Sequence, residues 1–292
     1  MADLIRNIMN KKITEVSYIG EPKSNTAMFL SAKAGHLLDN LETVENCLIF
    51  AEEGLNVPSN LLEKHSFKFS ANPQLAYYYF TKKISDQLTQ NNQLKEYKVL
   101  DNGARIGENV SLGDDVKIGA DVIIEHDSWI GDHVVLGSGA IIQRAKIENN
   151  VRIGENTVIG ADGYNLVRDE NGNLLSMPTL GRVEISQGVT INSNCTISAG
   201  LAGVTRIGSF SHIDSLSHIH HDCQIGEEVE IASSVSMGGF TTIKSGSFVG
   251  IGTNIKNRIV IGKNVLIGMG SVVIKDIPDN SKAYGVPAQV IE

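Results

Sequence analysis

Four of the eight histidines in this sequence of 292 residues fall within ten positions, at His212, His218, His220 and His221. An imidazole has a pKa of about 6.5, so it accepts a proton readily at neutral pH and is a suitable general base. Asp222 follows His221 directly, and a neighbouring carboxylate can orient an imidazole and stabilise its charged form. We predict that His221 is a catalytic base and Asp222 its partner. The other three histidines are either substrate contacts or solvated side chains.

A repeat of six residues predicts the elements that position these side chains. A large aliphatic residue recurs at every sixth position, and the residue two positions before it is mostly small or β-branched, as a narrow interior requires. Neither a helix, with a period of about 3.6, nor a half-buried strand, with a period of about 2, explains this spacing, but short strands joined by corners do. The aliphatic positions are Ile207, Ile213, Ile219, Ile225, Ile231, Met237, Ile243, Val249, Ile255, Ile261, Ile267 and Val273.

A second run of the same period extends from Ile106 to Ile142 and, after one missing residue, from Ile147 to Ile159. Hexapeptide repeats build a parallel β-helix in which three repeats form one triangular coil. We therefore predict a mainly β fold, a left-handed parallel β-helix, in which residues eighteen apart stack. Stacking places Gly239 one coil above His221, where its N–H could donate a hydrogen bond to an oxyanion, so we count Gly239 among the predicted catalytic residues.

Glycines often follow the aliphatic position, as at Gly208, Gly226, Gly238 and Gly262. We expect each of them to supply the positive φ of a sharp corner, because glycine adopts that conformation without steric cost.

The first hundred residues lack the repeat and predict a small α/β domain, so we divide the chain into residues 1–100 and 101–292. Strands are expected at Ile13–Ile19, Ala27–Ser31, Cys47–Ala51 and Ser66–Ser70. A helix then starts at an Asn72 cap and Pro73, with an apolar face of Tyr77, Phe80, Ile84 and Leu88. Within the β-helix the period breaks at about 160–182, which predicts an extruded loop that covers part of a cleft.

The composition argues against several classes of protein. The net charge is -8, with 25 basic and 33 acidic residues and no basic run, so we expect no nucleic-acid partner. No apolar run approaches the roughly 20 residues that span a bilayer, and Met1–Arg6 has no secretory pattern. The three scattered cysteines predict free thiols. We predict a cytoplasmic protein without a membrane span.

Zinc is the alternative use of histidine nitrogens. A zinc site in a β-helix of this kind needs histidines from separate coils and facing chains, whereas this cluster lies within one predicted coil. We therefore predict no metal.

Several segments carry a family resemblance: Phe29-Leu30-Ser31, Asn72-Pro73-Gln74-Leu75-Ala76-Tyr77, Gly160-Ala161-Asp162-Gly163-Tyr164, Pro178-Thr179-Leu180-Gly181-Arg182-Val183, and Ile213-Asp214 leading to His221. In these the chain resembles the UDP-3-O-acylglucosamine N-acyltransferases of lipid A synthesis over nearly its full length. The resemblance implies a uridine-binding N-terminal domain, in which Phe29 stacks on uracil, and a base, His221, that takes the proton of a sugar amine. It also implies a homotrimer with active sites between neighbouring subunits.

Other segments depart from that family. Ala32 and Gly35 replace an asparagine and a tyrosine, Ser198-Ala199-Gly200 replaces its Asp-Arg-Gly signature, and Arg258 stands in place of its second histidine. The C-terminal segments Asp276-Ile277-Pro278-Asp279 and Gly285-Val286-Pro287-Ala288 resemble those of coenzyme A-dependent hexapeptide acetyltransferases. His221-Asp222-Cys223 with Ile225-Gly226 resembles the bacillosamine-type nucleotide-amino-sugar N-acetyltransferases, which use acetyl-CoA.

We therefore predict an N-acyltransferase that moves an acetyl or other short acyl group from acyl-CoA to the amino group of a nucleotide-linked amino sugar in surface-polysaccharide synthesis. One alternative is a UDP-3-O-(3-hydroxyacyl)glucosamine N-acyltransferase that uses acyl carrier protein. The other is a non-catalytic β-helix scaffold or binding protein. The predicted substrate contacts are Phe29, Asp162, Tyr164, Asp214, His218 and His220.

The predicted coenzyme A contacts are Gly250, Gly252, Lys256, Arg258 and Gly268. The glycines would admit the pantetheine arm and the two cations would meet phosphates. The glycines are equally expected as plain corners, the two cations as solvated side chains, and Asp162 and Tyr164 as stabilisers of the loop turn.

Overall fold

The computed structural model describes Ile13 and residues 15–291; the segment Met1–Arg6, where we expected no secretory signal, lies outside the described residues. The chain forms two compact units. The first contains residues up to Asn91 together with Tyr164–Gly181, and the second contains Asn92–Gly163 and the chain from Arg182 onward. This division differs from a boundary after residue 100, because β5 (Tyr97–Val99) pairs with β6 (Arg105–Gly107) of the second unit.

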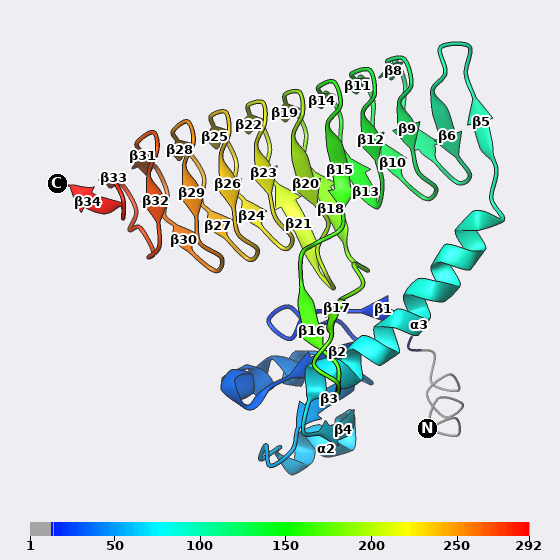
Figure 1. The fold of residues 1–292 in the computed structure, drawn as a ribbon, viewed down its shortest axis with the longest axis vertical. Helices are drawn as coiled ribbons and strands as arrows, with labels where there is room; N and C mark the ends of the chain where they lie inside the picture. Colours follow the sequence, from blue (N-terminus) through cyan, green and yellow to red (C-terminus); the bar gives the residue numbers. More distant parts are fainter. Residues whose placement is uncertain (1–12, 14, 292) are drawn as a thin grey trace. The chain divides into compact units, whose positions relative to one another are not determined.

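The second unit is a left-handed parallel β-helix, in agreement with the sequence prediction, and Figure 1 shows its coils stacked from β6 to β32. Each coil passes through three sheets. Sheet 1 contains β5, β6, β9 (Ile123–Ile124), β12 (Ile141–Ile142), β15 (Val158–Ala161), β20 (Thr196–Ser198), β23 (His218–Ile219), β26 (Ser236–Met237), β29 (Asn254–Ile255) and β32 (Val272–Val273).

Sheet 2 contains β7 (Ser111–Leu112), β10 (Trp129–Ile130), β13 (Ala145–Ile147), β18 (Arg182–Ile185), β21 (Val204–Ile207), β24 (Gln224–Ile225), β27 (Thr242–Ile243) and β30 (Val260–Ile261). Sheet 3 contains β8 (Lys117–Ile118), β11 (Val135–Leu136), β14 (Arg152–Ile153), β19 (Thr190–Ile191), β22 (His212–Ile213), β25 (Glu230–Ile231), β28 (Phe248–Val249), β31 (Leu266–Ile267), β33 (Lys282–Tyr284) and β34 (Gln289–Ile291).

The aliphatic positions of the repeat form the core of the β-helix. Every one from Ile207 to Val273 is buried, with at most 4% of its surface exposed. Their strands pair in the predicted register, so that Ile219 lies beside Met237, eighteen residues later. Leu112 is 40% exposed instead, because β7 is the terminal strand of sheet 2 and has a neighbour on one side only.

The role predicted for the corner glycines is wrong. The residues with positive φ lie two positions later, at Phe210, Asp222, Phe240 and Gly252 among others. The glycine directly after the aliphatic residue is needed for space: a Cβ on Gly226 would lie 2.5 Å from the Ser245 nitrogen of the next coil. Successive coils are thus too close at these points for any side chain.

The first unit contains a parallel sheet in the order β1-β2-β3-β4, and its strands confirm the sequence prediction. Its elements are β1 (Glu15–Val16), β2 (Thr26–Leu30), the 3₁₀ helix η1 (Ala32–Thr43), β3 (Leu48–Glu52), α2 (Ser59–Lys64), β4 (Ser66–Ser70) and α3 (Pro73–Gln93). Asn72 caps α3 as predicted, because its Oδ1 accepts a hydrogen bond from the Leu75 N–H at 3.0 Å. Leu88, predicted on the apolar face, is 50% exposed, since the buried residues of α3 end at Thr81.

The extruded segment forms a hairpin of β16 (Leu166–Arg168) and β17 (Leu174–Ser176). Val167 and Met177 are buried against Leu48, Phe50 and Tyr77 of the first unit. The segment that interrupts the repeat is therefore part of the core of the first unit.

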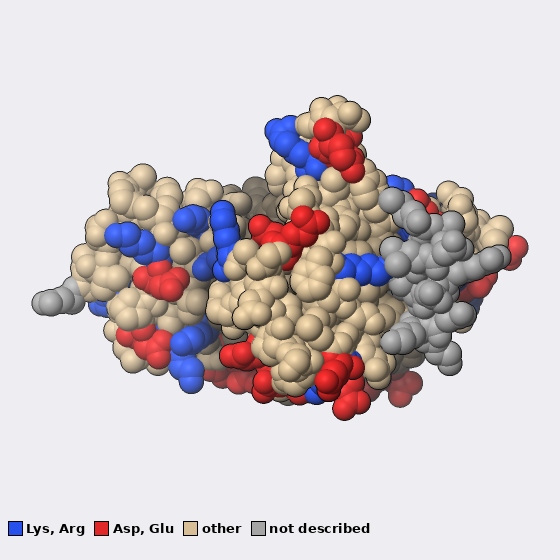
Figure 2. All heavy atoms as spheres, turned by 90° about the horizontal axis from the view of Figure 1, so that it is seen from below, with Lys and Arg blue, Asp and Glu red and all other residues tan. Residues whose placement is uncertain are grey.

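Charged side chains are mixed on the molecular surface. On the face drawn in Figure 2, basic and acidic side chains of the described residues are scattered among broad uncharged areas, with several acidic ones along the lower edge. None of the described helices has the length and apolar character needed to cross a membrane.

Candidate active site

His221 lies at the corner between sheet 1 and sheet 2, two residues after the end of β23. We call the stacked residues 220–222, 238–240 and 256–258 the His221 corner. The Nδ1 of His221 lies 2.9 Å from Oδ2 of Asp222, and the two side chains are only 10% and 6% exposed. A carboxylate at this distance favours the imidazole tautomer that carries its proton on Nδ1, so that Nε2 is available to accept one.

Gly239 lies one coil beyond His221, where the repeat predicts it. A Cβ at this position would be 2.6 Å from Cε1 and 2.7 Å from Nε2 of His221, so only glycine leaves room for the ring. Among the described residues no acceptor binds the Gly239 N–H. The corner therefore combines a proton acceptor with an amide donor, which are the two groups that acyl transfer to an amine requires.

Asp222 has contacts that the sequence prediction missed. Its Oδ2 accepts a hydrogen bond from the Leu201 N–H at 3.0 Å, and its own N–H donates to Oγ1 of Thr205 at 2.8 Å. Leu201 lies in a segment that is longer than the repeat allows. The sequence contains the signal for it, since Ile207 follows Ile197 by ten residues where the repeat expects six.

His218 and His220 lie beside His221, and their rings stack at 4.6 Å. Burial lowers the pKa of His218. Burial, together with the charges of His218 and His221, lowers the pKa of His220 to about 4. The Nδ1 of His220 is buried and has no hydrogen-bond partner among the described residues. Both side chains are therefore uncharged at neutral pH, as suits contacts to neutral sugar groups.

Further residues at this corner enclose the base. The Phe240 ring packs edge-on against His221 at 5.3 Å, and the Arg258 guanidinium lies 4.4 Å above the Phe240 ring centre. Gly163 also contacts His221, because a Cβ there would lie 2.9 Å from the His221 Cβ. Of the predicted coenzyme A contacts, Lys256 and Arg258 thus share the corner with the base.

Other predicted site residues lie elsewhere in the β-helix. Asp214, Gly250, Gly252 and Gly268 are on the corner between sheet 3 and sheet 1, so within one chain the glycines are not grouped with Lys256 and Arg258. Asp214 accepts a hydrogen bond from the Asn192 side chain at 2.9 Å, and this bond lowers the pKa of its carboxyl group. Gly252 has a φ of 68°, which is the conformation of a plain corner.

The three remaining substrate candidates have structural contacts or high exposure. Asp162 forms an ion pair with Arg144 at 2.8 Å, next to the start of the extruded segment. Tyr164 is 73% exposed and belongs to the first unit. Phe29, also in the first unit, packs against Tyr77 with 5.2 Å between ring centres.

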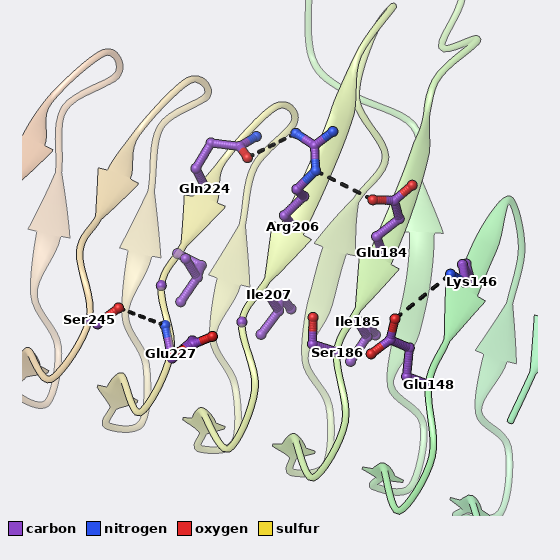
Figure 3. A pocket seen from close by; sticks show the side chains of 13 residues that line it. Lys146, Glu148, Glu184, Ile185, Ser186, Arg206, Ile207, Gln224, Glu227 and Ser245 are labelled. Atoms are coloured by element: carbon purple, nitrogen blue, oxygen red, sulfur yellow. Dashed lines mark hydrogen bonds and ion pairs between the residues drawn. The ribbon is translucent and has the colours of Figure 1, made fainter. Parts of the chain in front are cut away.

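A hollow of about 370 Å³ lies on sheet 2, and its lining does not include His221, Asp222 or Gly239 (Figure 3). Its central cation, Arg206, pairs with Glu184 of β18 at 3.3 Å and with Gln224 of β24 at 3.2 Å. Because Glu184 neutralises the charge of Arg206, we assign no ligand to this surface. Among the described residues no three His, Cys, Asp or Glu side chains are placed to hold a metal ion.

Comparison with known proteins agrees with the fold. Residues 109–144 match the family described as bacterial transferase hexapeptide (six repeats). Two curated relatives are named UDP-3-O-acylglucosamine N-acyltransferase: that of Methylorubrum populi is 31% identical over 53% of this chain, and that of Coxiella burnetii is 34% identical over 49%. The matches span only 44% and 37% of the length of those relatives.

Solved structures show the same architecture. A UDP-N-acetylglucosamine acyltransferase from Campylobacter jejuni superposes with a TM-score of 0.60 at 28% identity, covering 66% of this chain and 74% of that one. The enzyme of that name from Francisella novicida also gives a TM-score of 0.60, at 25% identity, over 66% of this chain and 68% of its own. The chain therefore resembles the hexapeptide-repeat acyltransferases of lipid A synthesis.

Proposed function

We propose that this hexapeptide-repeat protein is an acyltransferase that transfers an acyl group from a thioester to the amino group of a nucleotide-linked amino sugar. The observation that carries the proposal is the grouping of His221, Asp222 and Gly239 at one corner, with Nδ1 of His221 held at 2.9 Å from the carboxylate and Gly239 against the other side of the ring.

Each group has a defined role in the reaction. The sugar amine attacks the thioester carbon, and Nε2 of His221 takes the proton that the nitrogen loses. The carbonyl oxygen gains negative charge, which the Gly239 N–H stabilises by a hydrogen bond. The intermediate collapses with cleavage of the C–S bond, and the departing thiolate regains a proton from the imidazolium. Asp222 stabilises the imidazolium between these steps.

For the acceptor and donor, the relatives favour the lipid A alternative over the acetyl-CoA reading, since they are named UDP-3-O-acylglucosamine N-acyltransferases. We therefore propose UDP-3-O-acylglucosamine as the first acceptor to test, with a 3-hydroxyacyl group on acyl carrier protein as its donor.

Transfer of a short acyl group from acyl-CoA stays as the second candidate. One observation favours it: Lys256 and Arg258 lie on the same corner as the base, where cations could meet the phosphates of coenzyme A.

A thiol-release assay tests the proposal. Acetyl-CoA and 3-hydroxyacyl carrier protein are each offered with UDP-3-O-acylglucosamine and with a panel of UDP-, dTDP- and GDP-linked amino sugars. We expect turnover with one pair and a fall of at least about 100-fold in kcat for His221→Ala, because general base catalysis typically contributes that much or more. His212→Ala is the matched control, since His212 is exposed on sheet 3. A His221→Ala protein that turns over like wild type would overturn the proposed mechanism. A protein that binds a nucleotide sugar but releases no thiol from any donor would instead be a scaffold.

A further inference from the structure

Resting on the proposed function, we propose that the insertion Gly200–Gly203 is a positioning element for the base, which holds the Asp222 carboxylate on Nδ1 of His221. This assigns roles to Leu201 through its backbone N–H, to Gly203 through its missing side chain, and to Thr205 through its hydroxyl.

The insertion is an irregularity of the coil at one place. Strand β23 pairs with β26 at a spacing of eighteen residues, whereas β20 pairs with β23 at a spacing of twenty-two, as Ile197 beside Ile219 shows. The four additional residues lie between β20 and β21. Their ends are fixed to β18, because the Gly200 N–H donates to the Arg182 oxygen at 3.3 Å and the Arg182 N–H donates to the Gly203 oxygen at 3.2 Å.

The insertion places one hydrogen-bond donor on the catalytic carboxylate. Oδ2 of Asp222 accepts both from the Leu201 N–H at 3.0 Å and from the His221 ring at 2.9 Å. A backbone donor at this distance fixes the orientation of the carboxylate. Asp222 is 7% exposed, so water contributes little to holding it.

Thr205 fixes the backbone of the same residue. Asp222 has a φ of 59°, which is uncommon outside glycine, and its N–H donates to the buried Oγ1 of Thr205 at 2.8 Å. Elsewhere in the coil, an inward serine accepts from the N–H eighteen residues later, as Ser211 does from Val229. Thr205 accepts from a residue seventeen positions later, which directs its hydroxyl to Asp222.

The space for the carboxylate depends on Gly203. A Cβ at Gly203 would lie 2.7 Å from Oδ1 of Asp222, and its next nearest contact would be Cγ of the same side chain at 3.8 Å. A methyl group there therefore displaces the Asp222 carboxylate and meets no other atom closely. The φ of Gly203 is not in the positive region, so alanine fits the backbone.

The test compares wild type with Gly203→Ala. We expect kcat to fall by about tenfold or more with KM within about twofold, because the variant weakens a group that acts on the base and not on the substrate. In an Asp222→Gly background, which tolerates the positive φ, adding Gly203→Ala should have no further effect on kcat. His212→Ala, on the exposed side of sheet 3, is the control and should keep wild-type kcat.

A second pair of variants addresses Thr205. Thr205→Ser keeps the hydroxyl and should retain most of the activity, while the isosteric Thr205→Val should lower kcat like Gly203→Ala. A kcat for Gly203→Ala equal to that of wild type, or an equal further loss in the Asp222→Gly background, would overturn the proposal.

A readout without turnover separates this proposal from the proposed function. In ¹⁵N-labelled protein, the His221 ring nitrogens should report the Nδ1–H tautomer in wild type and a loss of that preference in Gly203→Ala. If the tautomer changes but no substrate pair is turned over, the positioning role stands and the proposed reaction fails. If the wild-type protein is active and Gly203→Ala changes neither kcat nor the tautomer of His221, the positioning role fails.

Discussion

At the scale of single residues, the His221 corner limits what can stand at each position. One nitrogen of His221 contacts a carboxylate and the other faces Gly239, so both ring nitrogens have defined roles. His218 and His220 add two uncharged imidazoles next to the base. His221 thus has one side-chain partner on Nδ1, Asp222, while the two neighbouring imidazoles stay uncharged at neutral pH.

The first prediction at this scale concerns Gly239. We expect Gly239→Ala to lower kcat by at least about tenfold, because a Cβ 2.6 Å from the His221 ring must displace the imidazole. Steady-state kinetics measures this effect, and the melting temperature shows whether the variant is folded. A folded Gly239→Ala protein with wild-type kcat would contradict the proposed site.

The second prediction concerns pH and stability. Burial lowers the pKa of His220 from 6.5 to about 4, so the folded chain binds fewer protons than the unfolded chain between these values. The stability contributed by His220 is therefore present above about pH 6.5 and is lost as the pH falls toward 4. His218, whose pKa is also lowered by burial, adds to the same trend.

His220→Phe should keep the ring stacking and remove the titration. We expect its melting temperature to fall less than that of wild type between pH 7 and pH 4.5, as followed by circular dichroism. Parallel curves for the two proteins would show that His220 does not become charged in this range.

At the scale of elements, the corners of the β-helix require two kinds of glycine. Glycine is needed at position 226 because the backbone of the next coil leaves no space for a side chain. Glycine is needed at position 252 because its φ is 68°, which other residues rarely adopt. A Cβ on Gly226 would lie 2.5 Å from the Ser245 nitrogen, whereas a Cβ on Gly252 would meet nothing within 4 Å.

Alanine substitutions should separate these two reasons. Gly252→Ala should lower the free energy of unfolding by about 1–2 kcal/mol, the cost of a left-handed conformation. Gly226→Ala should cost more, about 3 kcal/mol, because backbone of the next coil must move. Denaturant unfolding measures both values, and a larger cost for Gly252→Ala would contradict this assignment.

At the scale of the whole molecule, the surface of the β-helix suggests further assembly. Ile251 and Met269, on the corner between sheet 3 and sheet 1, are 51% and 74% exposed. Adjacent exposed apolar side chains commonly mark contact surfaces. The family resemblance of the sequence implies three copies of this chain.

We predict a homotrimer, with a mass in solution three times the 31.5 kDa of the chain. Light scattering coupled to size-exclusion chromatography measures this mass. A monomer that is active in the thiol-release assay would contradict the prediction that one site takes residues from two subunits.

The sequence by itself determined the fold and which residues lie together at the proposed site. With a period of six, the residues that lie side by side in successive coils follow from their spacing in the sequence. The burial of the aliphatic positions from Ile207 to Val273 and the stacking of Gly239 on His221 could therefore be predicted without coordinates. The pairing of His221 with Asp222 followed from adjacency and the chemistry of imidazole.

Only the tertiary structure decided the contacts that depend on departures from the repeat. The Leu201 N–H reaches Asp222 because four inserted residues shift the coil, and Val167 and Met177 are buried because the extruded segment folds into the first unit. The corner glycines were assigned the wrong role because φ and the distance between coils are not encoded in a period. Counting residues predicts which positions stack, whereas the direction of an inserted backbone depends on the atoms against which it packs.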